Sequence, residues 1–123
     1  MTSENEAGVR KVMEQYMSGT FEGDVESLKA CFHPKAVMNG YLGDKLLIGT
    51  PEPFFQDMGS NPSMASGGLP YKGEILSLEI QEGVASVTLK EEGFPMDMAF
   101  INYFHLLIDE GDWKIISKTF TLL

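Results

Sequence analysis

The sequence is informative first for what it has little of. It holds one cysteine, Cys31, so no disulfide can form within the chain, and a reducing, cytoplasmic setting is favoured. Only nine Lys and Arg stand against 18 Asp and Glu, which gives a formal net charge of −9. Affinity for nucleic acid depends on clustered basic side chains that displace counterions, and here they are scattered. We therefore expect no nucleic-acid partner.

Long apolar runs and ligand motifs are also lacking. No run approaches the roughly 18 to 20 apolar residues that cross a bilayer, and the acidic start MTSENEAGVRK does not resemble a secretory signal, so we expect no membrane partner. The 13 glycines form no phosphate-binding fingerprint between a strand and a helix. A zinc site built on His33 and His105 would lack its other ligands in any recognisable spacing. No metal and no cofactor are expected.

What is present is enough for one folded unit. With 123 residues, 43% of them hydrophobic and 22% charged, the chain has the size and composition of one domain, residues 1–123. A domain of this size removes roughly two-thirds of its unfolded surface from water. Neither a disulfide nor a metal is needed to hold such a core together.

Helical signals occupy the first half of the chain. Asp24 has the character of an N-cap for a short helix that Pro34 ends, and Thr50 caps a third helix whose first residue is a proline. A longer helix is predicted over residues 3–19, with Gly19 as its stop. Its apolar residues recur at i, i+3, i+4, i+7 and i+8 and share one face: Val9, Val12, Met13, Tyr16 and Met17.

Strand signals dominate the rest. Residues 36–49 read as two short strands joined through Gly43-Asp44, and residues 59–70 are turn-forming residues of a loop. From Tyr71 onward apolar and polar residues alternate, with turns at Glu82-Gly83 and at residues 110–112. Helices first and an antiparallel meander afterwards indicate an α+β fold, with N-terminal helices packed on a curved, mostly antiparallel sheet.

The third meander strand, residues 97–108, is apolar on both faces. Phe100, Phe104 and Leu106 lie on one parity, and Ile101, Tyr103 and Leu107 lie on the other. The helices of so small a chain can cover only one face of a sheet. A second copy of the chain is the simplest cover for the other face, so we expect a homodimer formed through the sheet.

The stretch GDVESLKACFHPKAVMNGYLGDKLLIGTPEPFF resembles the signature region of the putative lumazine-binding family. That family belongs to the NTF2-like (cystatin-like) superfamily, with the SnoaL-like proteins and ketosteroid isomerase. The Gly23-Asp24 pair, the Phe32-His33-Pro34 triplet and the closing WKII with Lys118 carry the resemblance. It implies a cone in which a curved sheet wraps around helices and encloses a pocket, with dimerisation through the sheet.

The resemblance also indicates where catalytic residues would fall. The carboxylate base of the related isomerases falls on Asn39 or Gly40, their second acid falls on Asn102, and their tyrosine falls on Tyr16. Such isomerases need a general base and a proton-donating acid. Amide side chains cannot take up a proton at neutral pH and cannot serve as the base or the acid, so chemistry of the ketosteroid isomerase type is not expected.

Tyr16, Asn39 and Asn102 can instead orient a ligand in an apolar pocket. With Tyr41 and His105 they form the set of candidate ligand-binding residues, and the expected ligand is a small, largely apolar organic molecule. The plainer interpretation is that each amide satisfies a backbone group or a buried water.

His105 leaves a choice of functions open. Histidine titrates near neutral pH, so an inward His105, or Tyr16, would suit a SnoaL-like enzyme of isomerase, dehydratase or cyclase type. An outward His105 would belong to the dimer surface, and strand parity separates it from Asn102. A third interpretation is an interaction module with a vestigial pocket. His33 is expected to cap the preceding helix, and Cys31 is expected in the core.

Overall fold

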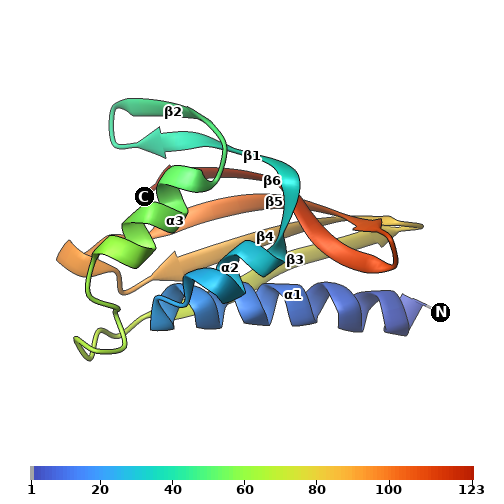
Figure 1. Cartoon of the computed structure of the whole chain (residues 1–123), viewed down its shortest axis with the longest axis horizontal. Coiled ribbons are helices and arrows are strands. Elements are labelled where there is room, and N and C mark those ends of the chain that lie inside the picture. Colours follow the sequence, from blue (N-terminus) through green and yellow to red (C-terminus); the bar gives the residue numbers. More distant parts are fainter. Residues whose placement is uncertain (1) are drawn as a thin grey trace.

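The structure, a computed structural model, describes residues 2–123. Three helices and a six-stranded sheet form its framework, and a 3₁₀ turn at Pro95–Asp97 precedes the fifth strand (Figure 1). The strand order is β2-β1-β6-β5-β4-β3, and every neighbouring pair is antiparallel except β1 with β6. The elements are α1 (Thr2–Glu22), α2 (Val25–Cys31), β1 (Phe32–Leu42), β2 (Lys45–Gly49), α3 (Glu52–Ser60), β3 (Lys72–Gln81), β4 (Val84–Glu92), β5 (Phe100–Asp109) and β6 (Asp112–Leu122). The α+β expectation is confirmed.

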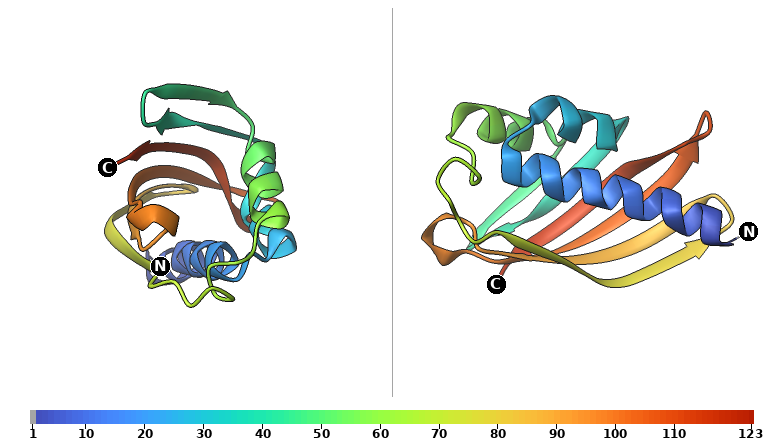
Figure 2. Two further views of the ribbon diagram at one scale, coloured as in Figure 1. Left: turned by 90° about the vertical axis from the view of Figure 1, so that its left-hand side faces the viewer. Right: turned by 90° about the horizontal axis from the view of Figure 1, so that it is seen from below.

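The sheet bends around the helices. Figure 2 shows α1 running along the concave side of the sheet, with α2 and α3 closing the side next to β1. The apolar face of α1 packs into this concavity, where Val9, Met13 and Tyr16 are fully buried. Strands β4, β5 and β6 meet them with Val87, Leu89, Phe104, Leu106 and Ile115.

The glycine that stops the first helix lies four residues later than the sequence indicates. Gly19 lies inside α1 because the helix passes close to α2, where a Cβ at Gly19 would lie 3.0 Å from Cγ of Leu28. The stop is Gly23, whose φ of 68° is the left-handed conformation of a helix C-terminus. The Asp24 N–H then donates to the Gly19 carbonyl at 2.9 Å, which is the 6→1 bond of a Schellman motif.

Other local signals are confirmed. The Asp24 side chain accepts a hydrogen bond from the Ser27 N–H at 3.2 Å and caps α2. The predicted turns at Gly43-Asp44 and Glu82-Gly83 join β1 to β2 and β3 to β4. The loop after α3 is tied to α1, since Ala65 N–H donates to the Phe21 carbonyl at 3.0 Å.

A β-bulge in β6 decides which side chains of that strand point inward. The register with β5 pairs Leu106 with Ile115 and His105 with Ser117, so Ile116 is an extra residue. After the bulge the parity is reversed. Lys118 and Phe120 consequently share the buried, concave face with Ile115, although strict alternation would separate them.

Within residues 2–123, no helix is both long and apolar enough to span a membrane. A cytoplasmic setting stays a prediction.

Gly40 offers a test of how tightly β1 and β6 approach. A Cβ at Gly40 would lie 2.1 Å from the carbonyl oxygen of Phe120, which is backbone and cannot move aside alone. We expect Gly40→Ala to lower the free energy of unfolding by about 3 kcal/mol, because overpacking forces the strands apart. Urea unfolding measures the change.

The matched control is Gly49→Ala at the end of β2, where an added Cβ meets nothing within 4 Å. This substitution should alter stability by less than about 0.5 kcal/mol. Equal effects of the two substitutions would contradict the close contact between β1 and β6.

Candidate ligand-binding site

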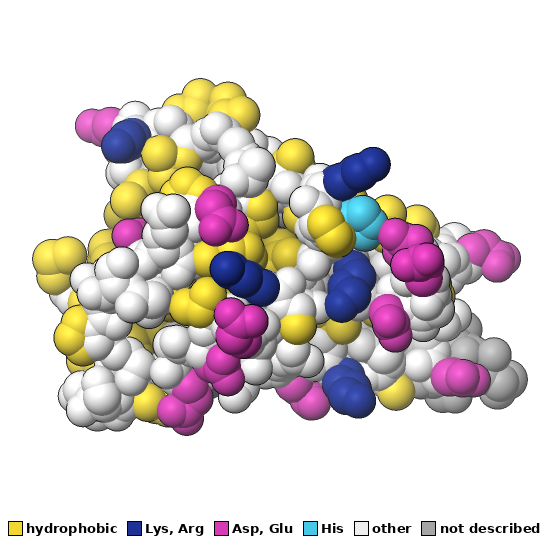
Figure 3. Space-filling view, in the orientation of Figure 1, with side chains coloured by type: hydrophobic (Ala, Val, Ile, Leu, Met, Phe, Trp, Pro, Cys, Tyr) yellow, Lys and Arg dark blue, Asp and Glu magenta, His cyan; other side chains and the backbone are white. Residues whose placement is uncertain are grey.

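A hollow of about 770 Å³ lies between the concave face of the sheet, α1, α3 and the loop after α3. This volume is within the range of small-molecule sites. Most of its wall is apolar: Met38, Leu42, Phe54, Met58, Met64, Phe94, Met98, Phe100 and Phe120. Figure 3 shows hydrophobic side chains gathered on the left of the molecule, around α3 and the β1–β2 hairpin, whereas charged side chains gather over α1 and α2.

Lys118 provides an amine inside this apolar wall. Its side chain is only 5% exposed, and Nζ donates a hydrogen bond to the Tyr16 hydroxyl at 2.6 Å. The ammonium also lies 4.4 Å from the centre of the Phe54 ring and 5.3 Å from that of Phe120, which is cation–π range. Burial lowers the pKa of Lys118 to about 8, against the opposing field of Glu91.

Glu91 provides a buried carboxyl group on the same wall. Its oxygens accept hydrogen bonds from the Tyr71 hydroxyl at 2.6 Å and from Asn102 Nδ2 at 2.9 Å. Burial raises the pKa of Glu91, while Lys118 and these two hydrogen bonds act in the opposite direction. Burial likewise raises the pKa of Tyr71 and of Tyr16, and the charge of Glu91 adds to both shifts.

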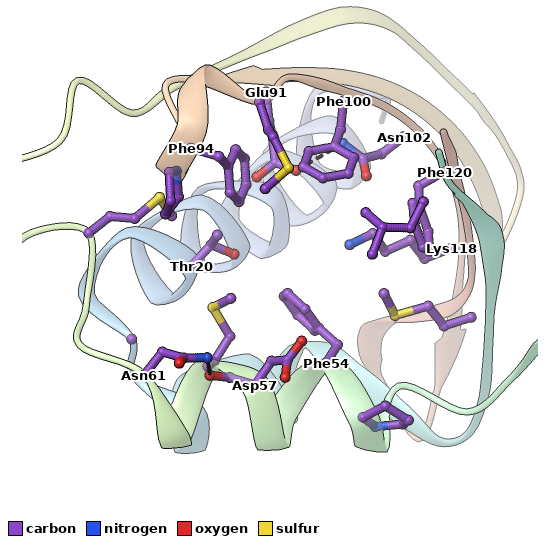
Figure 4. A pocket seen from close by; sticks show the side chains of 18 of the residues that line it. Thr20, Phe54, Asp57, Asn61, Glu91, Phe94, Phe100, Asn102, Lys118 and Phe120 are labelled. Atoms are coloured by element: carbon purple, nitrogen blue, oxygen red, sulfur yellow. Dashed lines mark hydrogen bonds between the residues drawn. The ribbon is translucent and has the colours of Figure 1, made fainter. Parts of the chain in front are cut away.

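Two further polar groups face the hollow with hydrogen-bonding capacity to spare. Thr20 is 1% exposed, and in the described part of the chain its Oγ1 makes no hydrogen bond of good geometry, although it lies near enough to the Tyr16 hydroxyl to lower the pKa of that group. Asn102 uses Nδ2 for both Glu91 and the Leu89 carbonyl, which assigns the orientation of its amide. Figure 4 shows the Thr20 hydroxyl, the Asn102 carbonyl oxygen and the Lys118 amine directed into one space.

Of the predicted site residues, Tyr16 and Asn102 line the hollow and Asn39 does not. Asn39 Oδ1 accepts a hydrogen bond from the Gly49 N–H at 3.3 Å, which is the plainer role considered for it. The expectation that Asn39 shares a cavity with Tyr16 and Asn102 is therefore wrong. The reason is parity, because Met38 of β1 faces the hollow and its neighbour Asn39 must face the other side.

Tyr41 and His105 also lie away from the hollow. Tyr41 is half exposed and borders, with Asn39, a shallower depression of about 440 Å³ on the outer face of the sheet. His105 is exposed, opposite Ser86 on β4 and Ser117 on β6. Ligand roles for Asn39, Tyr41 and His105 in the large hollow therefore lose their geometric basis.

The deep polar groups are not amides alone, as the sequence had suggested. Glu91 adds a carboxyl group, because it continues the inward alternation of Ala85, Val87 and Leu89 along β4. The alternation of apolar and polar residues along β4 is the sequence signal that indicates an inward Glu91. Gly40, the other position matched to the isomerase base, has no room for a side chain against Phe120.

His33 and Cys31 have structural surroundings. His33 Nε2 lies 2.7 Å from Asp109 Oδ2, and Nδ1 accepts from the Lys35 N–H. The expected cap of α2 by His33 is wrong, since Lys114 Nζ donates to the Ala30 carbonyl instead. Cys31 is in the core, where burial raises its thiol pKa to about 12. In the described residues no three His, Cys, Asp or Glu side chains cluster as metal ligands.

The depressed pKa of Lys118 predicts a pH-dependent difference between wild type and Lys118→Met. The unfolded chain keeps the Lys118 proton to about pH 10.5, whereas the folded chain releases it near pH 8. Wild-type stability therefore gains from rising pH over that window, and the variant has no such gain. Between pH 7 and pH 10.5 the free energy of unfolding of Lys118→Met should fall by about 3 kcal/mol relative to that of the wild type.

Urea unfolding at several pH values measures this difference, and Lys90→Met is the control because the Lys90 side chain is 41% exposed. The Lys90→Met difference should be nearly constant with pH. A constant Lys118→Met difference would show that the amine is not desolvated.

Comparison with protein families matches residues 4–121 to the family described as "Putative lumazine-binding". A search of curated proteins found no match. Among solved structures, an NTF2-like protein of unknown function from Methylobacillus flagellatus is 28% identical, with a TM-score of 0.86 over 98% of this chain and 93% of that chain. A second, from Silicibacter pomeroyi, is 24% identical, with a TM-score of 0.88 over 100% and 99%.

A ketosteroid isomerase-like protein from Erwinia carotovora atroseptica is 15% identical, with a TM-score of 0.71 over 95% of both chains. At that identity the likeness shows the fold alone. The match over nearly the whole chain and the shared cone architecture agree with the resemblance carried by the sequence. The chain belongs to the putative lumazine-binding family and has the NTF2-like fold.

Proposed function

We propose that this protein binds a small, largely apolar organic molecule in the hollow, with the polar end of the molecule held by Lys118, Asn102 and Thr20. The observation that carries the proposal is the set of buried polar groups with unused hydrogen-bonding capacity that face one apolar cavity (Figure 4). A buried hydroxyl without a partner is unfavourable by about 1 to 3 kcal/mol, so Thr20 favours an occupant that bonds to it.

The side chains that line the hollow indicate which class of ligand it would bind. Aromatic and methionine side chains surround most of the space and suit a flat or flexible apolar body, because methionine adapts to irregular shapes. Lys118 offers N–H donors, and the Asn102 carbonyl oxygen offers an acceptor. A ligand that combines a carbonyl or hydroxyl group with an apolar body fits this arrangement better than a uniformly polar heterocycle such as lumazine.

An acid–base enzyme is the second candidate, and the titratable groups of the hollow favour it. Glu91, Tyr16 and Lys118 all have pKa values displaced by burial, which is a feature of catalytic sites. A route through His105 has no support, since His105 is on the outer face. A mechanism that uses Tyr16 keeps its support. Glu91 would provide the carboxyl group, because the positions matched to the isomerase acids hold amides or glycine.

A thermal-shift screen tests ligand binding. The panel holds fatty acids, steroids, flavin precursors and lumazine, and we expect neutral apolar members with a single polar end to raise the melting temperature. A ligand at 100 times its dissociation constant adds about 2.7 kcal/mol to stability. Absence of a shift with every compound would remove the support for binding.

The variant Thr20→Val separates binding from nonspecific stabilisation. Replacing the unpartnered hydroxyl by a methyl group should stabilise the free protein by about 1 kcal/mol and reduce the ligand-induced shift. Thr119→Val, an exposed change on β6, is the control and should leave the shift unchanged. An undiminished shift in Thr20→Val would place the ligand elsewhere.

We also propose that two copies associate through the outer face of the sheet. Several large apolar side chains are exposed there around the 440 Å³ depression: Tyr41 (50%), Leu46 (52%), Ile48 (77%) and Tyr103 (55%). Isolated exposed apolar residues are ordinary, but a contiguous patch on one face of a sheet favours a partner. A two-fold axis through the patch would bring identical apolar groups together.

Tyr103→Asp tests this association. Two carboxylates brought together across a two-fold axis repel each other and are desolvated, so the variant should sediment as a monomer where the wild type sediments as a dimer. The control is Met96→Asp, because Met96 is 87% exposed in the 3₁₀ turn, away from the patch. A monomeric wild type at high concentration would refute the proposal.

A further inference from the structure

We propose that Lys118 captures an aldehyde or ketone in the hollow as a reversible imine, with the Tyr16 hydroxyl handling the proton. The proposal rests on the proposed function, because the carbonyl compound must first bind in the same hollow. It names the substrate class of that site as carbonyl compounds with an apolar body.

The first support is the unusual setting of the Lys118 amine. A fully buried lysine is ordinarily paired with a carboxylate. In the described residues Lys118 Nζ has no carboxylate oxygen within 4.0 Å and one hydrogen-bond partner, the neutral Tyr16 hydroxyl. The amine therefore lines the hollow without the counter-ion that would hold it permanently as an ammonium.

The second support is the fraction of neutral amine that this setting produces. Neutral lysine, not its ammonium form, is the nucleophile toward carbonyl carbon. With its pKa lowered to about 8, about half of Lys118 is neutral at pH 8, whereas an ordinary lysine is less than about 1% neutral. The titratable groups that border the same space are Tyr16 of α1, Asp57 of α3 and Glu91 of β4.

These acidic groups also select the ligand. Glu91 and Asp57 border the hollow, so a ligand that brought a carboxylate would add negative charge where two carboxyl groups already stand. A neutral carbonyl avoids that repulsion, and its oxygen can accept a hydrogen bond from Tyr16 or Thr20. The apolar wall accommodates the remainder of the molecule.

The reaction balances without an oxidant or reductant. The nitrogen lone pair of neutral Lys118 forms a bond to the carbonyl carbon, and the C=O π electrons move to oxygen, which takes a proton from the Tyr16 hydroxyl. The nitrogen then returns a proton to the Tyr16 oxygen. The Tyr16 hydroxyl then protonates the carbinolamine hydroxyl, which leaves as water while the nitrogen lone pair completes the C=N bond. The iminium nitrogen returns its proton to the Tyr16 oxygen. Amine and carbonyl give imine and one water.

Reductive trapping in the wild-type protein tests the proposal. The protein is incubated at pH 8 with 2-naphthaldehyde, octanal or 2-acetylnaphthalene and sodium cyanoborohydride, and the modified lysines are identified by peptide mass spectrometry. We expect Lys118 to carry at least about tenfold more adduct than any of the other seven lysines, which are internal controls. The unreactive alcohol 2-naphthalenemethanol should bind by calorimetry and suppress the Lys118 adduct.

The outcomes separate the two proposals. Selective labelling of Lys118 that the alcohol suppresses supports both. If the alcohol binds but labelling is spread over the surface lysines, the imine proposal is overturned and the binding proposal stands. If neither the alcohol nor any carbonyl compound of the panel binds or labels selectively, both are overturned.

Variants test the role of each group. Lys118→Arg keeps a cation among the aromatic rings but removes the nucleophile, so it should form no adduct at that position in a folded protein. Tyr16→Phe keeps the amine and the ring but removes the proton carrier, and it should form the Lys118 adduct at least about tenfold more slowly. An unchanged rate in a folded Tyr16→Phe protein would overturn the part assigned to Tyr16.

Discussion

A buried ammonium and a buried carboxyl group face the same hollow without forming an ion pair within 4.0 Å in the described structure. Desolvation of either charge is unfavourable by several kcal/mol, so each depends on its own neighbours. The Tyr16 hydroxyl and the rings of Phe54 and Phe120 stabilise Lys118. Tyr71 and Asn102 stabilise Glu91. The pKa shifts, the ligand chemistry and the reactivity proposed for Lys118 all follow from this arrangement.

The fold tolerates these buried polar groups because a bent sheet and three helices also bury a continuous hydrophobic core. Tyr16 joins the two regions, since its ring packs on Phe32 and Phe104 and its hydroxyl accepts from Lys118. Residues that keep an open, polar-lined cavity reduce stability relative to a filled one, and retaining them is typical of sites kept for function. The unpartnered Thr20 hydroxyl belongs to the same pattern.

The related structures share this architecture, but they are described in different terms. Two of them are described as proteins of unknown function and one as ketosteroid isomerase-like. A common fold supports many chemistries, so function has to be argued from the residues of the site. Here the position matched to the isomerase base on β1 is either turned outward, as Asn39, or without a side chain, as Gly40. The carboxyl group of this hollow comes from β4 instead.

Local sequence determined much of this protein. The apolar stripe of α1, the Asp24 cap and the glycine-containing turns act over a few residues, so their outcome could be predicted, as could the inward position of Tyr16 and the opposite faces of Asn102 and His105. Only tertiary structure decided the placement of Lys118, because the bulge at Ile116 reverses the parity of β6 and depends on pairing with β5. It also decided the partners of Glu91, since Tyr71 and Asn102 come from distant parts of the chain. Alternation along one strand gives relative faces, and long-range pairing determines which face encloses the hollow.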